Sequence, residues 1–189
     1  LKVEVWQNGN KYMQEYERGI PKYDLKVVGT ADHTGTRVTF VPDDEIFETL
    51  DFNYDTLRNR FREIAFLNKG LVISIEDLRE GRERQEVFEF KGGIVEFVKF
   101  LNKGKESLFE EPLYVCKINP TNEVEIAFQY NDGYSELIQS YANNINTEEG
   151  GTHLVGFKNA LTKIINDYGL TNKVLKETEK LSGEDVREG

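Results

Sequence analysis

Few residues of this 189-residue chain have the types and spacing that catalysis requires. The sequence contains no phosphate-binding string of the P-loop or GxGxxG kind, and no serine stands in a nucleophile elbow. Its acidic pairs, such as Asp43–Asp44, Glu110–Glu111 and Glu148–Glu149, consist of adjacent residues. Adjacent carboxylates point apart on a strand and spread around a helix, so we expect solvated side chains rather than a catalytic dyad. The sequence therefore predicts no catalytic residue.

The two histidines and the single cysteine do not form a set at metal-ligand spacing, so no metal site is predicted. His33 lies in a polar DHTG turn, where we expect it to be solvated. His153 follows Gly-Gly-Thr, so we expect it in the first turn of a helix, neutral and bonded to the neighbouring loop. Cys116 lies in the strand-like run LYVCKI, which favours a buried, inert thiol. A lone cysteine excludes an internal disulfide and fits a reducing cytoplasm.

The composition indicates an acidic globular chain. Hydrophobic residues make up 38% of it and charged residues 31%, and no apolar run approaches the roughly 20 residues that span a membrane. The first residues, LKVEVWQNGN, lack the basic and apolar regions of a signal peptide. The formal net charge of −10 argues against an extensive phosphate-binding surface, because such surfaces are basic. Any contact with DNA is therefore expected to be local.

The segment 141–161, YANNINTEEGGTHLVGFKNAL, organises the second half of the chain. A polar loop leads to Gly150-Gly151, and Thr152 is predicted to cap a helix that begins there abruptly. We therefore expect one of the two glycines to have a positive φ angle, and Gly169 to end the helix in a left-handed conformation. Apolar residues at three- and four-residue spacing define one face of this helix: Leu154, Phe157, Leu161, Ile164, Ile165 and Tyr168.

The remaining elements alternate hairpins and helices without a βαβ rhythm, which predicts an α+β fold. Hairpins are predicted over 3–16, with Asn8-Gly9 as the turn, over 71–90 and over 113–130. Further strands are predicted over 36–41 and 134–142, and helices over 53–68, 94–102, 172–181 and from Ser182 onward. Lys91-Gly92-Gly93 is predicted as a domain boundary, because paired glycines are flexible and follow a completed hairpin.

Several long strings resemble one family. NNIxTxEGGTHLxGFKxAL is similar to a transducer-domain string of the ATPase-bearing B subunits of bacterial type IIA topoisomerases, DNA gyrase and topoisomerase IV. FREIAFLNKGL resembles a helix that packs on their ATPase sheet, KGGIVEFVKFLNK the start of their transducer domain, and LSGEDVREG their SGDDAREG segment. The resemblance implies that residues 1–91 are the C-terminal part of a GHKL-type ATPase domain and residues 92–189 the N-terminal part of a transducer domain.

The resemblance also implies roles for individual residues. The string from Gly35 to Asp43 resembles the family's GTxVxFxPD strand, which closes the back of the ATP site. By this match the Thr36 hydroxyl would read the adenine edge, with Gly35 and Val38 in the same nucleotide site. Gln7 stands where the family usually has an arginine at the rim that contacts coumarin inhibitors, and an amide lacks the bidentate charged fork. Lys158, in the GFK string, matches a position that faces captured DNA.

Other parts of the family's ATP site are not matched. The helix that binds Mg²⁺, the adenine-binding aspartate and the phosphate loops would precede residue 1, and the lysine that contacts the γ-phosphate would follow residue 189. The chain also begins within a strand-like run, so we expect a fragment that alone binds neither ATP nor Mg²⁺ and is inactive. The parent protein is expected to use both, and to work in the cytoplasm with DNA, a second copy of itself and a gyrase A-type partner in an A2B2 assembly.

Two alternatives remain from the residues alone. One is another ATPase of the same superfamily, of the mismatch-repair or chaperone type, which shares the two-domain plan. The other is a non-catalytic scaffold or binding module that kept the fold. The GGTHL string argues against the first alternative. Gyrase and topoisomerase IV are not separated by this sequence, because the activity that distinguishes them resides in the partner subunit.

Overall fold

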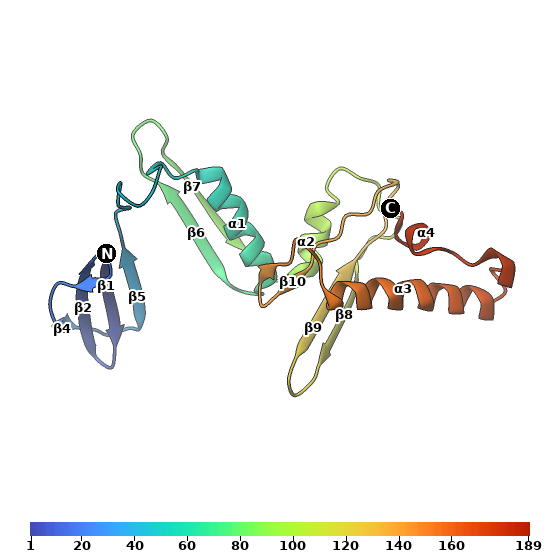
Figure 1. Ribbon diagram of the computed structural model, residues 1–189, viewed down its shortest axis with the longest axis horizontal. Helices are drawn as coiled ribbons and strands as arrows, with labels where there is room; N and C mark the ends of the chain where they lie inside the picture. The colour runs from blue at the N-terminus through green and yellow to red at the C-terminus, as the bar shows by residue number, and fades with distance from the viewer. The chain divides into compact units, whose positions relative to one another are not determined.

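The computed structural model describes all residues from Leu1 to Gly189, which form two compact units, Leu1–Asn53 and Tyr54–Gly189. The first unit contains only strands and loops, and the second combines helices with antiparallel hairpins (Figure 1). Mixed antiparallel sheets and helices of this kind confirm the predicted α+β class. None of the helices combines the length and the apolar character that crossing a membrane requires.

The first unit is an antiparallel sheet with the strand order β3-β2-β1-β5, in which β4 also pairs with β2. The predicted Asn8-Gly9 hairpin is present, because both residues have positive φ angles, 51° and 77°, and Gln7 pairs with Asn10. This is the backbone that a two-residue type I′ turn needs. The predicted 36–41 strand is β5, one residue earlier at its start. The strands are β1 Lys2–Gln7, β2 Asn10–Glu17, β3 Ile20–Pro21, β4 Lys26–Thr30 and β5 Gly35–Thr39.

The two faces of this sheet differ in chemistry. Val5 pairs with Thr36 and Val3 with Val38, so these four side chains share one face. On the other face Glu4 is 5% exposed. Its Oε1 atom forms ion pairs with Lys11 Nζ at 2.8 Å and with Lys2 Nζ at 3.4 Å. The hydrogen bond from Lys11 holds the pKa of Glu4 below its usual range.

The second unit has its core where α1 (Tyr54–Leu67) packs on the hairpin of β6 (Val72–Asp77) and β7 (Arg84–Glu89) (Figure 1). The predicted 53–68 helix and 71–90 hairpin are confirmed within a few residues. Phe66 stacks on Phe90 and on Phe97 of α2 (Ile94–Leu101), with ring centroids 3.6 and 4.7 Å away. The buried cluster consists of Tyr54, Ala65, Ile75 and Phe88.

The Lys91-Gly92-Gly93 segment is a packed joint rather than a flexible linker. The Gly92 amide donates to Glu96 Oε1 at 2.7 Å, and Gly93, with φ 62°, is the N-cap of α2. A Cβ atom at Gly93 would lie 2.6 Å from Cγ of Lys69. Glycine is therefore required here by close approach as well as by a left-handed φ. The aromatic stack of Phe66, Phe90 and Phe97 also crosses this joint, so the predicted domains 1–91 and 92–189 share packed side chains.

The third predicted hairpin is β8 (Leu113–Ile118) paired with β9 (Glu123–Phe128). The prediction that Cys116 is buried is wrong, because every residue of β8 is exposed and the Cys116 thiol donates to Glu123 Oε1 at 3.7 Å. No other strand pairs with this two-stranded sheet. A strand-like sequence does not show whether a third strand covers its side chains, and here none does.

The 134–142 strand is also only partly present. β10 comprises Tyr141–Ala142 alone and pairs with β11 (Ile145–Asn146). Residues 134–140 have no strand partner. The predicted turn helix at the C-terminus is present as α4 (Gly183–Arg187), because Ser182 and Asp185 form a capping box.

The long helix α3 spans Thr152–Thr171, so the predicted stop at Gly169 is wrong. Gly169 stays helical, and its missing side chain makes room for Leu175, whose Cδ1 would lie 2.6 Å from a Cβ atom there. The helix ends instead at Asn172, followed by Lys173 with φ 56°. The predicted lysine-rich helix over 172–181 is reduced to one 3₁₀ turn, η1 (Glu177–Glu179). The predicted cap at Thr152 is wrong, because Gly151 is the N-cap residue and Thr152 is the first helical residue; Gly151 has no side chain that could cap the helix.

Candidate functional site

The predicted nucleotide-contacting residues lie together on β5. Thr36 and Val38 alternate with Arg37 and so project from the same face, beside Val5 and Val3 of β1. Both side chains are exposed within their unit, and 56% of Val38 is accessible. Between β1 and β5 this face offers the Thr36 hydroxyl beside three valines, and Tyr12 and Gln14 of β2 continue the same face beyond β1. A hydroxyl beside apolar side chains suits a planar heterocycle with a polar edge.

Gly35 and Gln7 flank this face at one end of the strand pair. Gly35 pairs with Trp6, has no positive φ angle, and a Cβ atom there would only reach ordinary contact with Trp6 at 4.0 Å. Gln7 follows Trp6 at the end of β1 and is exposed. By strand alternation it projects from the face that carries Val5 and Thr36. The structure thus brings the four predicted residues of this site to one region of the sheet.

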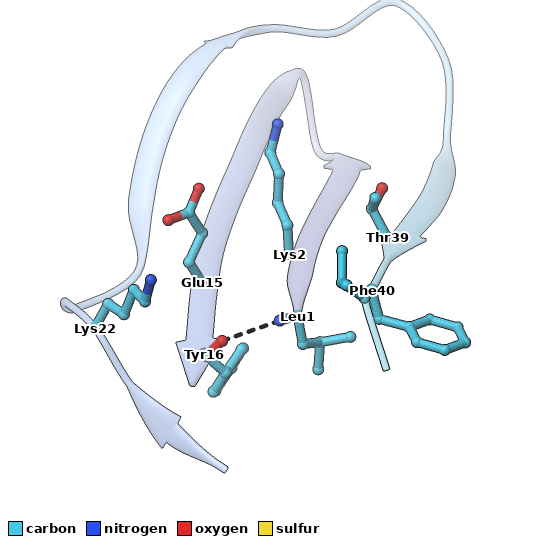
Figure 2. A pocket seen from close by; sticks show the side chains of 8 residues that line it. Leu1, Lys2, Glu15, Tyr16, Lys22, Thr39 and Phe40 are labelled. Carbon is cyan, nitrogen blue, oxygen red and sulfur yellow. Dashed lines mark hydrogen bonds between the residues drawn. The ribbon is translucent and has the colours of Figure 1, made fainter. Parts of the chain in front are cut away.

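A hollow on the sheet lies elsewhere. Its volume is about 240 Å³, and Figure 2 shows Lys2, Glu15 and Thr39 among its lining residues. Lys2 pairs with both Glu15 and Thr39, so these three share the face opposite Thr36. The hollow is therefore distinct from the predicted nucleotide face. Its full lining is Leu1, Lys2, Glu15, Tyr16, Lys22, Thr39, Phe40 and Val41.

Lys158, the predicted DNA contact, lies on α3 and is already paired. Its Nζ atom donates to Glu136 Oε1 at 2.7 Å, and Arg187 binds the other oxygen of the same carboxylate. The hydrogen bond from Lys158 lowers the pKa of Glu136, and Arg187 lowers it further. The cluster keeps one net positive charge, and 28% of the Lys158 side chain is exposed.

The Gly150-Gly151 turn is more constrained than predicted. Gly150 has φ 79°, and Gly151 has φ 154° with ψ 176°, so both glycines occupy conformations that disfavour other residues. The expectation that only one has a positive φ is wrong. His153 lies in the first turn of α3, with Nε2 3.3 Å from the Thr147 hydroxyl, and the predicted bond to the neighbouring loop is confirmed.

The role of Asn143 and Asn144 was missed, because both were expected only as polar loop residues. They form the two-residue turn between β10 and β11, with φ angles of 49° and 64°. Asn144 then binds α1: its carbonyl accepts from Arg60 Nη2 at 3.1 Å and its side chain donates to Asn68. The signal was present, since adjacent asparagines tolerate the left-handed conformation of a type I′ turn.

One group of possible metal ligands occurs on β8 and β9. Cys116, Glu123 and Glu125 bring ligand atoms within 4.8 Å of one another, and all three residues are exposed. Glu125, however, already accepts hydrogen bonds from Lys69 and Tyr114. We therefore assign no metal to this group.

Comparisons with known proteins agree on one family. A family model described as DNA gyrase B matches residues 93–189. The DNA gyrase B protein of Halalkalibacterium halodurans is 52% identical over 191 residues, which cover 100% of this chain and 30% of that protein. The DNA gyrase B protein of Bacillus mycoides is 51% identical over 191 residues, covering 100% of this chain and 47% of that protein.

A solved structure supports the same relationship. The 43K ATPase domain of Thermus thermophilus gyrase B, in complex with an aminocoumarin, has a TM-score of 0.85 and 39% identity, covering 100% of this chain and 52% of that one. The fold is therefore that of part of a GHKL-type ATPase domain, as found in subunits of the type IIA topoisomerase class. The chain belongs to the DNA gyrase B family. It spans 30% and 47% of the length of the two curated relatives.

Proposed function

We propose that this chain is the part of a type IIA topoisomerase ATPase subunit that joins the adenine side of the ATP site to the DNA-handling part of the enzyme. The observation that carries the proposal is the exposed Thr36–Val38 face in a chain of the DNA gyrase B family. Membership of this family disfavours the mismatch-repair, chaperone and scaffold alternatives. The reaction would be ATP-dependent supercoiling or strand passage of DNA, an isomerisation.

The nucleotide-site roles rest on the chemistry of that face. The Thr36 hydroxyl would hydrogen-bond the adenine edge, Val38 would contact the ring, and Gly35 would continue the wall at its end. Gln7 would lie at the rim, and its neutral amide would weaken the binding of coumarin-type inhibitors. The Thermus thermophilus domain that this chain resembles was solved in complex with an aminocoumarin.

The residues present fit the adenine end of ATP rather than its phosphates. The Thr36 face carries Val3, Val5 and Val38, with Tyr12 and Gln14 of β2 beyond them, and these strands place no carboxylate there for Mg²⁺. In the parent protein ATP would supply the energy for strand passage. Residues outside this chain would hold the phosphates and the metal, and the chain by itself is expected to bind ATP weakly or not at all.

The coupling role rests on the second unit. Residues 1–91 would belong to the ATPase domain and residues 92–189 to the transducer, and the family match that begins at residue 93 supports this division. α1 lies before the division, yet it contacts α2 through Phe66 and the β10–β11 turn through Arg60. A displacement of α1 would therefore reach elements after the division through packed contacts.

The partners would be those of a cytoplasmic topoisomerase: DNA, a second copy of this subunit and a gyrase A-type subunit. Lys158 would contribute to DNA binding only by exchanging Glu136 for a phosphate, since the two side chains are bonded in the free chain. The acidic net charge confines such a contact to a small part of the surface.

The proposal is tested with the full-length subunit that contains this stretch, mixed with its A-type partner and relaxed plasmid. We expect supercoiling or strand passage that requires ATP. Supercoiling would identify gyrase activity, and decatenation without supercoiling the topoisomerase IV type. Absence of any ATP-dependent change in topology, with both subunits folded, would contradict the proposal.

A further inference from the structure

The Lys69 side chain connects two distant elements of the second unit. It follows α1, which ends at Leu67, and its Nζ atom donates to Tyr114 Oη and to Glu125 Oε1, each at 3.0 Å. Tyr114 lies on β8, and Glu125 lies on β9. One side chain after the end of a helix therefore binds both strands of a hairpin that is distant in sequence. Tyr114 lies 45 residues after Lys69.

The path of the Lys69 side chain crosses the packed glycine joint. A Cβ atom at Gly93 would lie 2.6 Å from Lys69 Cγ and 2.7 Å from Lys69 Cε. Real Cβ atoms essentially never have contacts below 3.0 Å, so the stem passes directly over the backbone at a place where glycine leaves space for it. Gly93 is buried, which shows that the stem of Lys69 and its neighbours cover this backbone.

The three side chains form a closed set. The Tyr114 hydroxyl donates to Glu125 Oε1, which also accepts from Lys69, and the Lys69 ammonium lies 4.6 Å from the centroid of the Tyr114 ring. The hydrogen bond from Tyr114 lowers the pKa of Glu125. The hydrogen bonds that Lys69 donates to Tyr114 and Glu125 raise the pKa of Lys69. Both groups therefore stay charged throughout the neutral pH range. A cation bound by a carboxylate and an aromatic face is more restrained than an isolated surface pair.

A second lysine provides the comparison. Lys99 of α2 pairs with Glu111 at 2.7 Å, and 44% of its side chain is exposed, the same fraction as for Lys69. Both residues of that pair lie after the glycine joint, so the pair does not connect the two sides. Lys69 and Lys99 thus differ in what they join rather than in distance or exposure.

We propose that Lys69 is a positioning residue that ties the end of α1 to the β8–β9 hairpin across Gly93, so that a movement of α1 displaces the hairpin. This inference rests on the proposed function, in which a displacement of α1 would reach the elements after residue 91. The hairpin has no third strand in this chain, so α2, Lys69 and the apolar contact of Phe128 with Phe157 position it. Without Lys69 the hairpin would keep its fold and lose its link to the end of α1.

The variants separate charge from packing. Lys69→Met keeps most of the stem over Gly93 and removes the ammonium, and Glu125→Gln removes the carboxylate charge with the same shape. If both act on one contact, the double variant should behave like either single variant. Lys69→Arg retains a cation and should restore part of the effect. Lys99→Met removes an equally exposed lysine on one side of the joint and is the matched control.

The first readout is amide hydrogen exchange of residues 113–128 in the full-length subunit, with and without a non-hydrolysable ATP analogue. In the wild type we expect the nucleotide to change exchange in the hairpin. In Lys69→Met that change should shrink by about three- to tenfold, the range expected for a residue in a coupling network. In Lys99→Met it should persist. A purely structural role would instead speed exchange equally in both nucleotide states.

The second readout is the number of supercoils or decatenation events per ATP hydrolysed, which should fall about three- to tenfold in Lys69→Met, with ATP affinity unchanged. A hairpin that responds to nucleotide equally in the wild type and in Lys69→Met would overturn the inference and leave the proposed function standing. So would a wild-type hairpin that does not respond while supercoiling is normal. Loss of ATP-dependent activity in the wild type itself would overturn the proposed function, and this inference with it.

Discussion

The side-chain amide of Asn144 donates a hydrogen bond to Asn68 Oδ1, 2.9 Å away, and so joins the β10–β11 turn to the end of α1. The Asn68 amide in turn donates to the Ile64 carbonyl at 2.7 Å, within the last turn of that helix. Asn144 thus has two tasks: it adopts the left-handed backbone of the turn, and it docks that turn on the helix. This explains why the segment 141–161 carries paired asparagines before its paired glycines.

Replacing Asn144 by Ala should destabilise the chain by about 1–2 kcal/mol, because it combines left-handed strain with a lost hydrogen bond. Asn144→Gly relieves the strain and loses only the bond, so it should cost less. Asn143→Gly retains the turn and both contacts of Asn144 and serves as control. Urea unfolding measures all three. Equal midpoints for Asn144→Ala and Asn143→Gly would show that the docking contact has no energetic weight.

The two glycines before α3 should respond unequally to alanine. Gly150→Ala meets only ordinary contact with Leu154, so its left-handed φ should cost about 1 kcal/mol. At Gly151 a Cβ atom would lie 2.8 Å from the His153 ring, and the φ and ψ angles suit glycine alone. There the cost should reach roughly 2–3 kcal/mol.

Gly156→Ala is the control for these variants, because it lies inside α3 with open space around it. It should stabilise the chain by about 0.5–1 kcal/mol. Thermal melts rank the three variants. If Gly151→Ala melts with the wild type, the turn before α3 is not constrained as described. In the full-length subunit we expect Gly151→Ala to lose strand passage while it still binds ATP.

Lys158→Glu in the full-length subunit should weaken DNA stimulation of the ATPase, and the loss should shrink as salt rises, because phosphate contacts are screened. Glu136→Gln should act in the opposite direction, since it releases Lys158 and Arg187 from their shared carboxylate. Lys163→Glu, on the exposed side of the same helix, is the control. Stimulation at low salt that is the same for Lys158→Glu and the wild type would refute the DNA contact.

Stability should fall in acid partly through Asp77. The side-chain bonds from Arg79, at 2.6 and 2.8 Å, lower the pKa of Asp77 to about 2, from a usual value of 3.8. A carboxylate with a lowered pKa stabilises the fold above its unfolded pKa, and this contribution is lost as pH falls from about 4 to about 2. In Asp77→Asn the unfolding midpoint should therefore depend less steeply on pH in this window. An acid limb as steep in Asp77→Asn as in the wild type would exclude this contribution.

The features predicted correctly from sequence are those with a local cause. Asn8-Gly9 specifies its own turn, and Ser182 with Asp185 forms a capping box within four residues. The strand alternation that places Thr36 and Val38 on one face is likewise local. Local signals therefore predict most helices and hairpins, whereas the nucleotide-site roles of Thr36 and Val38 came from the family resemblance and stay predictions.

The errors concern residues whose environment depends on distant segments. Gly169 stays helical because Leu175 folds back over it, and Cys116 is exposed because nothing pairs with its hairpin. The packing of Lys69 on Gly93 likewise depends on a distant segment, and the division of the chain at Lys91–Gly93 stays a prediction. Gln7 is not one of these errors, but its position beside Gly35 also depends on the pairing register of two strands, and its role at the rim stays a prediction.

The proposed function depends most directly on Thr36 as the residue that reads adenine. Calorimetric titration of the full-length subunit with a non-hydrolysable ATP analogue tests this role. Thr39 offers a control on the same strand, because it pairs with Lys2 on the opposite face. Thr36→Ala should weaken binding by roughly five- to tenfold, the loss of one hydrogen bond, while Thr39→Ala should bind like the wild type. Equal affinities for the wild type and both variants would contradict the assignment of this face to the nucleotide.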